Sequence, residues 1–149
     1  MAAIDQSLLE ENDTSRKRVQ NFVASLSDED MACRVGEHWT VGVGLMHLAF
    51  WDRQWLAKLE EWERAGLVLV PPLAEVINGI NDGMLPWWRS IAPAQVRHEV
   101  VAAAEAIDAK IAHLTQKIVE PVLSVRPRTL ARATHRREHL DELERALGR

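Results

Sequence analysis

The chain has 149 residues, of which 47% are hydrophobic, and this length suits one domain, residues 1–149, with its own apolar core. The net charge is −4 and acidic and basic residues are interleaved, so no basic stripe exists to bind the phosphates of a nucleic acid. No secretory signal pattern and no apolar run of roughly 18 residues is present, and Cys33 is the single cysteine. We therefore expect a cytoplasmic protein with neither nucleic acid nor membrane as a partner.

Apolar residues recur at helical spacing in five segments, and no β-type alternation of useful length is present. The predicted helices cover residues 7–26, 41–64, 73–88, 93–118 and 129–147. Thr40 is suited to cap the second helix at its start, and Gly66 is suited to end it. Pro86 leaves the end of the third helix undecided. These segments predict an all-α fold, an antiparallel four-helix bundle with one shorter extra helix.

Three histidines are candidates for a metal site. His135 and His139 are four residues apart, which on a helix places their imidazoles one turn apart on one face. His47 lies at the edge of the apolar face of the second predicted helix, where Gly44 lets a neighbouring helix or a ligand approach closely. Bundle cores commonly assemble metal sites from facing helices. The alternative is that each histidine is hydrogen-bonded in the core. The other histidines have no partner at ligand spacing and are predicted on the surface or in loops: His38, His98 and His113.

Three short motifs occur in a fixed order along the chain. They are Trp39-Thr-Val-x-x-x-Leu-x-His47-Leu-Ala-x-Trp51-Asp52-Arg53, Val76-Ile77-Asn78-x-x-Asn81 and Thr134-His135-x-x-Glu138-His139-Leu140. In this combination the sequence resembles the DinB/YfiT-like superfamily, and within it the branch related to the N-terminal domain of mycothiol-dependent maleylpyruvate isomerase. The resemblance spans residues 7–147. It implies a four-helix bundle that holds one divalent metal ion on His47, His135 and His139.

The activities known in this superfamily are S-transfer and isomerisation with mycothiol or bacillithiol, and metal-dependent hydrolysis. The resemblance therefore implies a metal-dependent thiol S-transferase or hydrolase, with a low-molecular-weight thiol as a second cofactor. Maleylpyruvate isomerisation itself is not expected, because isomerases of the related branch carry a second domain after the bundle and only ten residues follow His139. A three-imidazole site keeps coordination positions open, and its ion lowers the pKa of bound water or thiol. Zinc, nickel, iron and manganese are all open.

Five further residues are candidates for catalysis or substrate binding. Arg132 and Arg136 lie on the inward arc of the last helix, so they either anchor an anionic substrate or extend their guanidinium groups to solvent at the bundle end. Trp51 is a candidate substrate contact, although tryptophan at helical spacing more often belongs to the core. Asp52 and Glu138 lie near the ligand candidates and are candidate catalytic groups that either orient a histidine or transfer a proton, with a solvated surface carboxylate as the favoured alternative.

Two other interpretations stay open. The segment His135-Arg-Arg-Glu138-His139 matches the H-x-x-E-H pattern of inverted zinc proteases, but those enzymes take a third ligand from well downstream. A non-catalytic stress or sequestration protein, in which the metal or a tryptophan-lined pocket binds a ligand, is the second class of function. A small-molecule substrate is the expected partner of the enzyme. The sequence leaves a homodimer open and decides neither the substrate nor the metal.

Overall fold

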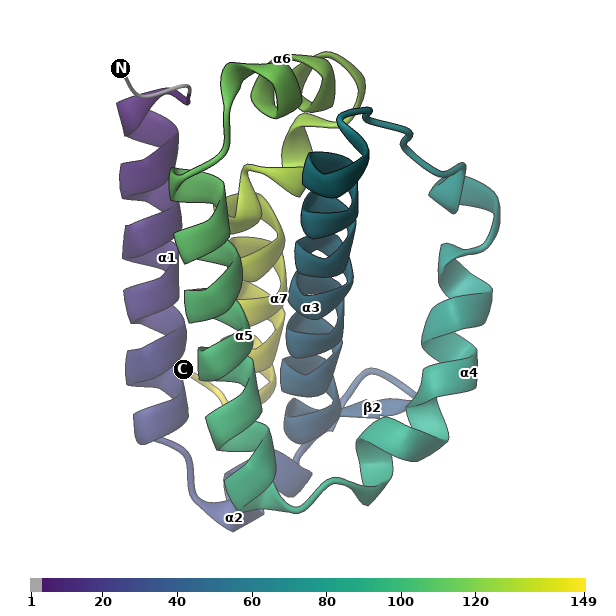
Figure 1. The fold of residues 1–149 in the computed structure, drawn as a ribbon. Helices are drawn as coiled ribbons and strands as arrows, with labels where there is room; N and C mark the ends of the chain where they lie inside the picture. Colours follow the sequence, from purple (N-terminus) through teal and green to yellow (C-terminus); the bar gives the residue numbers. More distant parts are fainter. Residues whose placement is uncertain (1–3) are drawn as a thin grey trace.

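Four long helices form a bundle in the computed structural model, which describes residues 4–149 (Figure 1). They are α1 (Gln6–Ala24), α3 (Val41–Ala65), α5 (Pro93–Ala112) and α7 (Arg132–Ala146). Helix α3 packs on α5 and α7, and α1 packs on the same two helices from the other side. The predicted all-α bundle is confirmed.

The helix directions refine the predicted antiparallel arrangement. In Figure 1, α3 and α5 run in the same direction, as do α1 and α7, whereas the pairs α1–α5 and α3–α7 are antiparallel. The parallel pair α3–α5 arises because α4 (Ile77–Ser90) carries the chain back along the outside of α3 before α5 begins. Helix α4 is the extra helix that the sequence predicts.

Two short helices were hidden in the sequence pattern, α2 (Asp28–Ala32) and α6 (Gln116–Val125). The helix predicted over residues 93–118 ends at Ala112, and the chain turns before α6. Apolar residues continue at helical spacing through this turn, because Ile111, Leu114 and Ile118 are all buried, so periodicity alone misses the change of direction. Within residues 4–149, no helix is both long and apolar enough to cross a lipid bilayer.

Two other predicted helix starts are also shifted. A 3₁₀ turn, Leu73–Glu75, precedes α4, and a second 3₁₀ turn, Pro127–Thr129, precedes α7, so the last helix begins at Arg132 rather than at Thr129. Proline at the first position of the second turn fixes φ for such a turn and removes a backbone donor. The first predicted helix is shifted by one or two residues at its ends.

A short hairpin with two residues in each strand leads into α3. Strand β1 (Arg34–Val35) pairs antiparallel with β2 (Trp39–Thr40), and Gly36 adopts the positive φ of 65° that the turn requires. Thr40 Oγ1 accepts a hydrogen bond from Val43 N at 3.2 Å, so the predicted N-cap is confirmed, and Gly66 ends α3 with a φ of 66°. The hairpin places Trp39 beside the first turns of α3.

The apolar core is divided into two clusters, one toward each end of the bundle. The first includes Phe22, Leu45 and Leu140, and the second includes Trp55, Trp62 and Ile107. Between them along the helices lie buried polar residues from all four bundle helices, and these are Asn12, Ser15, Asp52, Asp108, Arg132 and Arg136. This set is called the polar layer below.

Candidate metal centre

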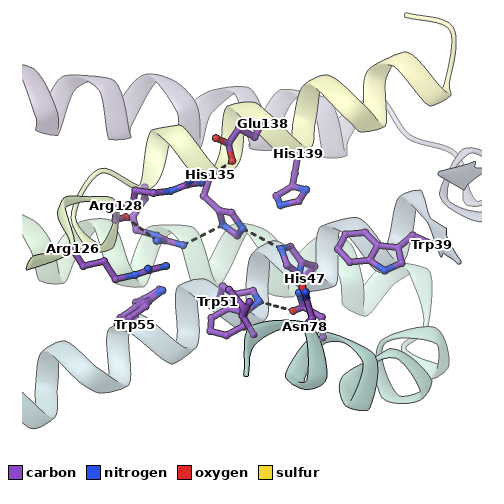
Figure 2. Close-up of a pocket in the computed structure, with 13 residues that line it drawn as sticks. Trp39, His47, Trp51, Trp55, Asn78, Arg126, Arg128, His135, Glu138 and His139 are labelled. Atoms are coloured by element: carbon purple, nitrogen blue, oxygen red, sulfur yellow. Dashed lines mark hydrogen bonds and ion pairs between the residues drawn. The ribbon is translucent and has the colours of Figure 1, made fainter. Parts of the chain in front are cut away.

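His47 on α3 and the pair His135 and His139 on α7 point toward one another in the bundle (Figure 2). One ring nitrogen from each lies within 4.8 Å of the others. His47 Nε2 is 3.1 Å from His135 Nε2. In the part of the chain that the structure describes, this is the one cluster of three His, Cys, Asp or Glu residues with metal-ligand spacing. The remaining histidines are exposed, as predicted: His38, His98 and His113.

The close approach of α3 and α7 brings the histidines together. A Cβ at Gly44 would lie 2.7 Å from Leu143 Cδ2, well inside van der Waals contact, so any side chain here would displace Leu143 of the neighbouring helix. This is the close helix approach predicted for that position. On α7 the four-residue spacing puts the ring centroids of His135 and His139 4.7 Å apart.

Aromatic rings enclose the cluster. The ring of Trp39 lies 4.8 Å from that of His47 and stacks on that of His139 at 6.0 Å. Trp88 of α4 meets His47 edge-on at 5.7 Å. As a result only 4% of His47 is exposed. Both the hairpin and α4 therefore serve to shield the histidines from water.

Burial keeps the three imidazoles neutral. It lowers the pKa of His47 to about 3, and the positive charge of the nearby Arg132 guanidinium acts in the same direction. Burial also lowers the pKa of His135, where the nearby Arg132 guanidinium adds to the effect, and it lowers the pKa of His139. The neutral ring is the form that binds a metal ion.

The hydrogen bonding of the cluster is incomplete. His47 Nδ1 and His139 Nδ1 are buried and make no hydrogen bond among residues 4–149, and His139 Nδ1 has only a longer contact with the Glu142 carboxylate at 3.5 Å. An unpaired buried polar atom is costly and calls for a specific explanation. Three neutral imidazoles with unpaired nitrogens fit a divalent metal ion, and they can hold one.

A buried ion pair supports His135 from behind. Arg132 Nη2 lies 3.3 Å from His135 Nδ1, and Arg132 Nε donates to Asp52 Oδ1 at 2.8 Å. Because a guanidinium only donates, Nδ1 of His135 is the acceptor in the metal-free chain, so the ring proton lies on Nε2 and is released if Nε2 binds a metal ion. Asp52 thus fixes Arg132, and Arg132 fixes the orientation of the imidazole.

Three charged residues for which exposure to solvent was one predicted alternative are buried instead. Arg132 and Arg136 are 2% and 1% exposed, so the prediction that they extend to solvent is wrong. Asp52 is also buried and is not a solvated surface carboxylate. These charges are buried because they neutralise one another: Arg136 contacts Asp52 at 3.3 Å and Asp108 at 2.8 Å. The sequence does contain one indication of a buried ion pair, because Asp108 lies on the apolar face of α5.

A cavity of about 290 Å³ opens beside the histidines. In Figure 2 the histidines and Trp39 lie at one end of it, and Arg126, Arg128 and Trp55 lie at the other. The candidates Trp51, Glu138 and Arg132 line it, whereas Asp52 and Arg136 do not. Arg126 and Arg128 were not among the residues predicted from sequence, because both lie in the connection between α6 and α7, where no periodicity marks an inward face.

Polar contacts hold the walls of this cavity in place. Trp51 Nε1 donates to Asn81 Oδ1 at 2.9 Å, which joins α3 to α4. Arg128 Nη2 donates to the Glu138 carboxylate at 2.7 Å. Trp51 and Glu138 thus form part of the cavity wall, where they can contact a ligand without filling the space beside the histidines.

A helical bundle with three inward histidines on two facing helices defines a class of candidate metal-binding proteins. Within that class, the sequence matches the family model described as the DinB family over residues 1–141, and the chain belongs to this family. The match names no branch of the family, so the relation to the mycothiol-dependent isomerase domain stays a prediction. Neither a search of curated proteins nor a search of solved structures found a match.

Proposed function

We propose that the protein is a metal-dependent enzyme, in which His47, His135 and His139 hold one divalent ion and a low-molecular-weight thiol or water attacks a small electrophile. The observation that carries this proposal is that the histidine cluster borders a cavity rather than a closed core. A structural metal site has four protein ligands, whereas this cluster has three. When bound, such an ion supplies acidity to a coordinated water or thiol.

The residues of the wall have separate proposed roles. Glu138 carries a carboxylate at the edge of the cavity, within reach of a ligand, and we assign to it the transfer of a proton to or from the substrate. Trp51 offers an apolar surface for the body of the substrate. Asp52 and Arg136 do not line the cavity, so neither contacts the substrate in this proposal. Asp52 instead acts as a positioning residue through its contact with Arg132.

Enzyme assays on metal-loaded protein test this function. The protein is loaded separately with zinc, nickel, iron(II) and manganese, and each form is assayed for transfer of bacillithiol, mycothiol or cysteine to a chlorodinitrobenzene and for hydrolysis of a nitrophenyl ester. We expect activity with at least one metal, and loss of that activity in the metal-free protein and in His47→Ala. His98→Ala, which changes an exposed histidine, is the control.

Equal activity with and without metal would exclude the proposed mechanism. Absence of all activity in a protein that still binds metal and small ligands would favour the sequestration function instead. That outcome would separate the binding of a metal, which both functions share, from catalysis, which only the first requires.

A further inference from the structure

The cavity is electrically asymmetric. Three arginines line its wall: Arg126 and Arg128 lie at the end away from His47 and His139, and Arg132 lies beside His135. Arg132 is paired with Asp52, and Arg128 is paired with Glu138. Arg126 has no ion-pair or side-chain hydrogen-bond partner among residues 4–149, and its Nε is buried. One cationic group in the wall of the cavity therefore lacks a counter-ion.

Arg126 is held in position by an aromatic ring. Its guanidinium carbon lies 4.9 Å from the centroid of the Trp55 ring, a cation–π contact, and Figure 2 shows the side chain extended over this ring toward the cavity. Burial and the charges of Arg128 and Arg132 lower the pKa of Arg126, so its charged form is disfavoured by its surroundings. A bound anion would reverse this effect, because it supplies the missing opposite charge.

We propose that Arg126 binds a carboxylate group of the ligand that occupies the cavity. This inference rests on the proposed function, since the other end of the same ligand then reaches the histidine centre. It narrows the ligand class to small molecules that carry a carboxylate at one end and a thiol or an electrophilic group at the other. Arg126 thus takes the anion-binding role for which the sequence suggested Arg132 and Arg136, because those two arginines already pair with buried aspartates.

A single carboxylate is the anion that this arrangement suits. A planar guanidinium forms two parallel hydrogen bonds to one carboxylate. A phosphate dianion needs more positive charge, and the neighbouring guanidinium groups of Arg128 and Arg132 are already engaged with Glu138 and Asp52. A volume of about 290 Å³ also limits the enclosed part of the ligand to a small molecule.

Two matched pairs of probes test the proposal. For the metal-loaded protein the pair is 3-mercaptopropionate and 3-mercaptopropanamide, and for the metal-free protein it is butyrate and butyramide. Each pair differs in charge and scarcely in shape. Dissociation constants are measured by titration calorimetry for the wild type, Arg126→Gln, Arg126→Lys and Arg128→Gln, with metal content and circular dichroism recorded for each protein.

We expect the wild type to bind the carboxylate probes roughly tenfold more tightly than the amides, as is typical of a charged hydrogen bond. Arg126→Gln should abolish this preference, Arg126→Lys should retain part of it, and Arg128→Gln should keep most of it. An unchanged preference in Arg126→Gln, an equal loss in Arg128→Gln, or no preference in the wild type would overturn the proposal. If the wild type held no metal, the proposed function would fail, while butyrate binding would still decide the role of Arg126.

Discussion

Two sets of buried polar side chains lie next to each other in this bundle, and they differ in how well they are satisfied. In the polar layer, two carboxylates face two guanidinium groups, and Arg136 donates to Asp52, Asp108, Ser15 and backbone carbonyls, so that its Nε alone among its nitrogens makes no hydrogen bond. In the histidine cluster, the buried Nδ1 atoms of His47 and His139 make no hydrogen bond among the described residues, and His139 Nδ1 has only a 3.5 Å contact with Glu142. A satisfied buried network holds helices together, whereas an unsatisfied one fits a ligand.

The two sets are connected through one side chain. Arg132 belongs to the polar layer through Asp52, and it also contacts the histidine cluster through His135. We therefore expect changes in the polar layer to affect the stability of the fold and, to a smaller extent, metal affinity. Changes in the histidine cluster should affect metal affinity with little loss of stability. The predictions below test this division, in order of decreasing effect.

Arg136→Met should have the largest effect. It leaves Asp108 and Asp52 with less compensation in a buried position, and removing one partner of a buried ion pair costs about 3–5 kcal/mol. Urea unfolding of the metal-free protein measures the loss. Arg137→Met, at an exposed neighbouring position, is the control and should change stability by less than about 0.5 kcal/mol. A similar small change in Arg136→Met would show that the polar layer does not hold the bundle together.

The stability of the metal-free protein should fall on acidification. The pKa of His47 is about 3 in the folded chain and 6.5 for an ordinary solvated histidine, as in the unfolded chain, so between these values the unfolded chain binds a proton that the folded chain does not. The stabilisation is complete above the higher value and is lost as the pH falls toward the lower one. For His47 alone we expect a loss of about 2 kcal/mol between pH 8 and pH 5.

Urea unfolding at a series of pH values checks this prediction. His47→Leu should show a weaker dependence on pH than the wild type, because the titrating ring is absent, whereas His98→Ala should behave as the wild type does. If His47→Leu and the wild type lost stability in parallel, the pKa of His47 could not be depressed as far as its burial implies.

Asp52→Asn should weaken metal binding by about tenfold. The amide cannot hold the Arg132 guanidinium as the carboxylate does, and groups that orient a metal ligand commonly contribute a factor of this size. Competition with a chromogenic chelator measures the affinity, and Asp82→Asn, on the exposed side of α4, is the control. Unaltered affinity in a folded Asp52→Asn protein would confine Asp52 to the polar layer.

His47→Leu should have the smallest effect on the stability of the metal-free protein at pH 8. The substitution loses the contact between His47 Nε2 and His135 Nε2, but it also removes the buried Nδ1 that has no partner and fills the space with apolar volume of comparable size, so the stability should change by less than about 1 kcal/mol. Thermal unfolding of metal-free samples measures it. A loss as large as that in Arg136→Met would place His47 among the residues that hold the fold.

Sequence patterns predicted the part of this molecule that depends on periodicity and local chemistry. Helical spacing predicts the bundle, and side-chain capping by Thr40 and the positive φ of Gly66 set the ends of α3. The spacing of His135 and His139 marks a common face, and the absence of a side chain at Gly44 marks a close approach that the structure contains.

The remaining features depend on partners distant in sequence. From sequence, Asp52 was expected to be solvated, to orient a histidine or to transfer a proton, and Arg136 was expected to bind an anion or extend to solvent. No local pattern indicates that the two side chains neutralise each other across the bundle. Arg126 lies in a connection without periodicity, and its inward direction follows from its contact with Trp55, more than 70 residues earlier. Buried charge pairs and loop residues are thus the features that required the structure.

The number of metal ions bound per chain tests the central claim most directly, namely that His47, His135 and His139 hold one ion together. Untagged wild type, His47→Ala and His98→Ala are loaded with the same divalent metal, desalted, and subjected to elemental analysis. We predict one ion per chain in the wild type and in His98→Ala, and a large loss in His47→Ala, because two imidazoles alone bind weakly. Undiminished stoichiometric metal in His47→Ala would contradict the three-histidine centre.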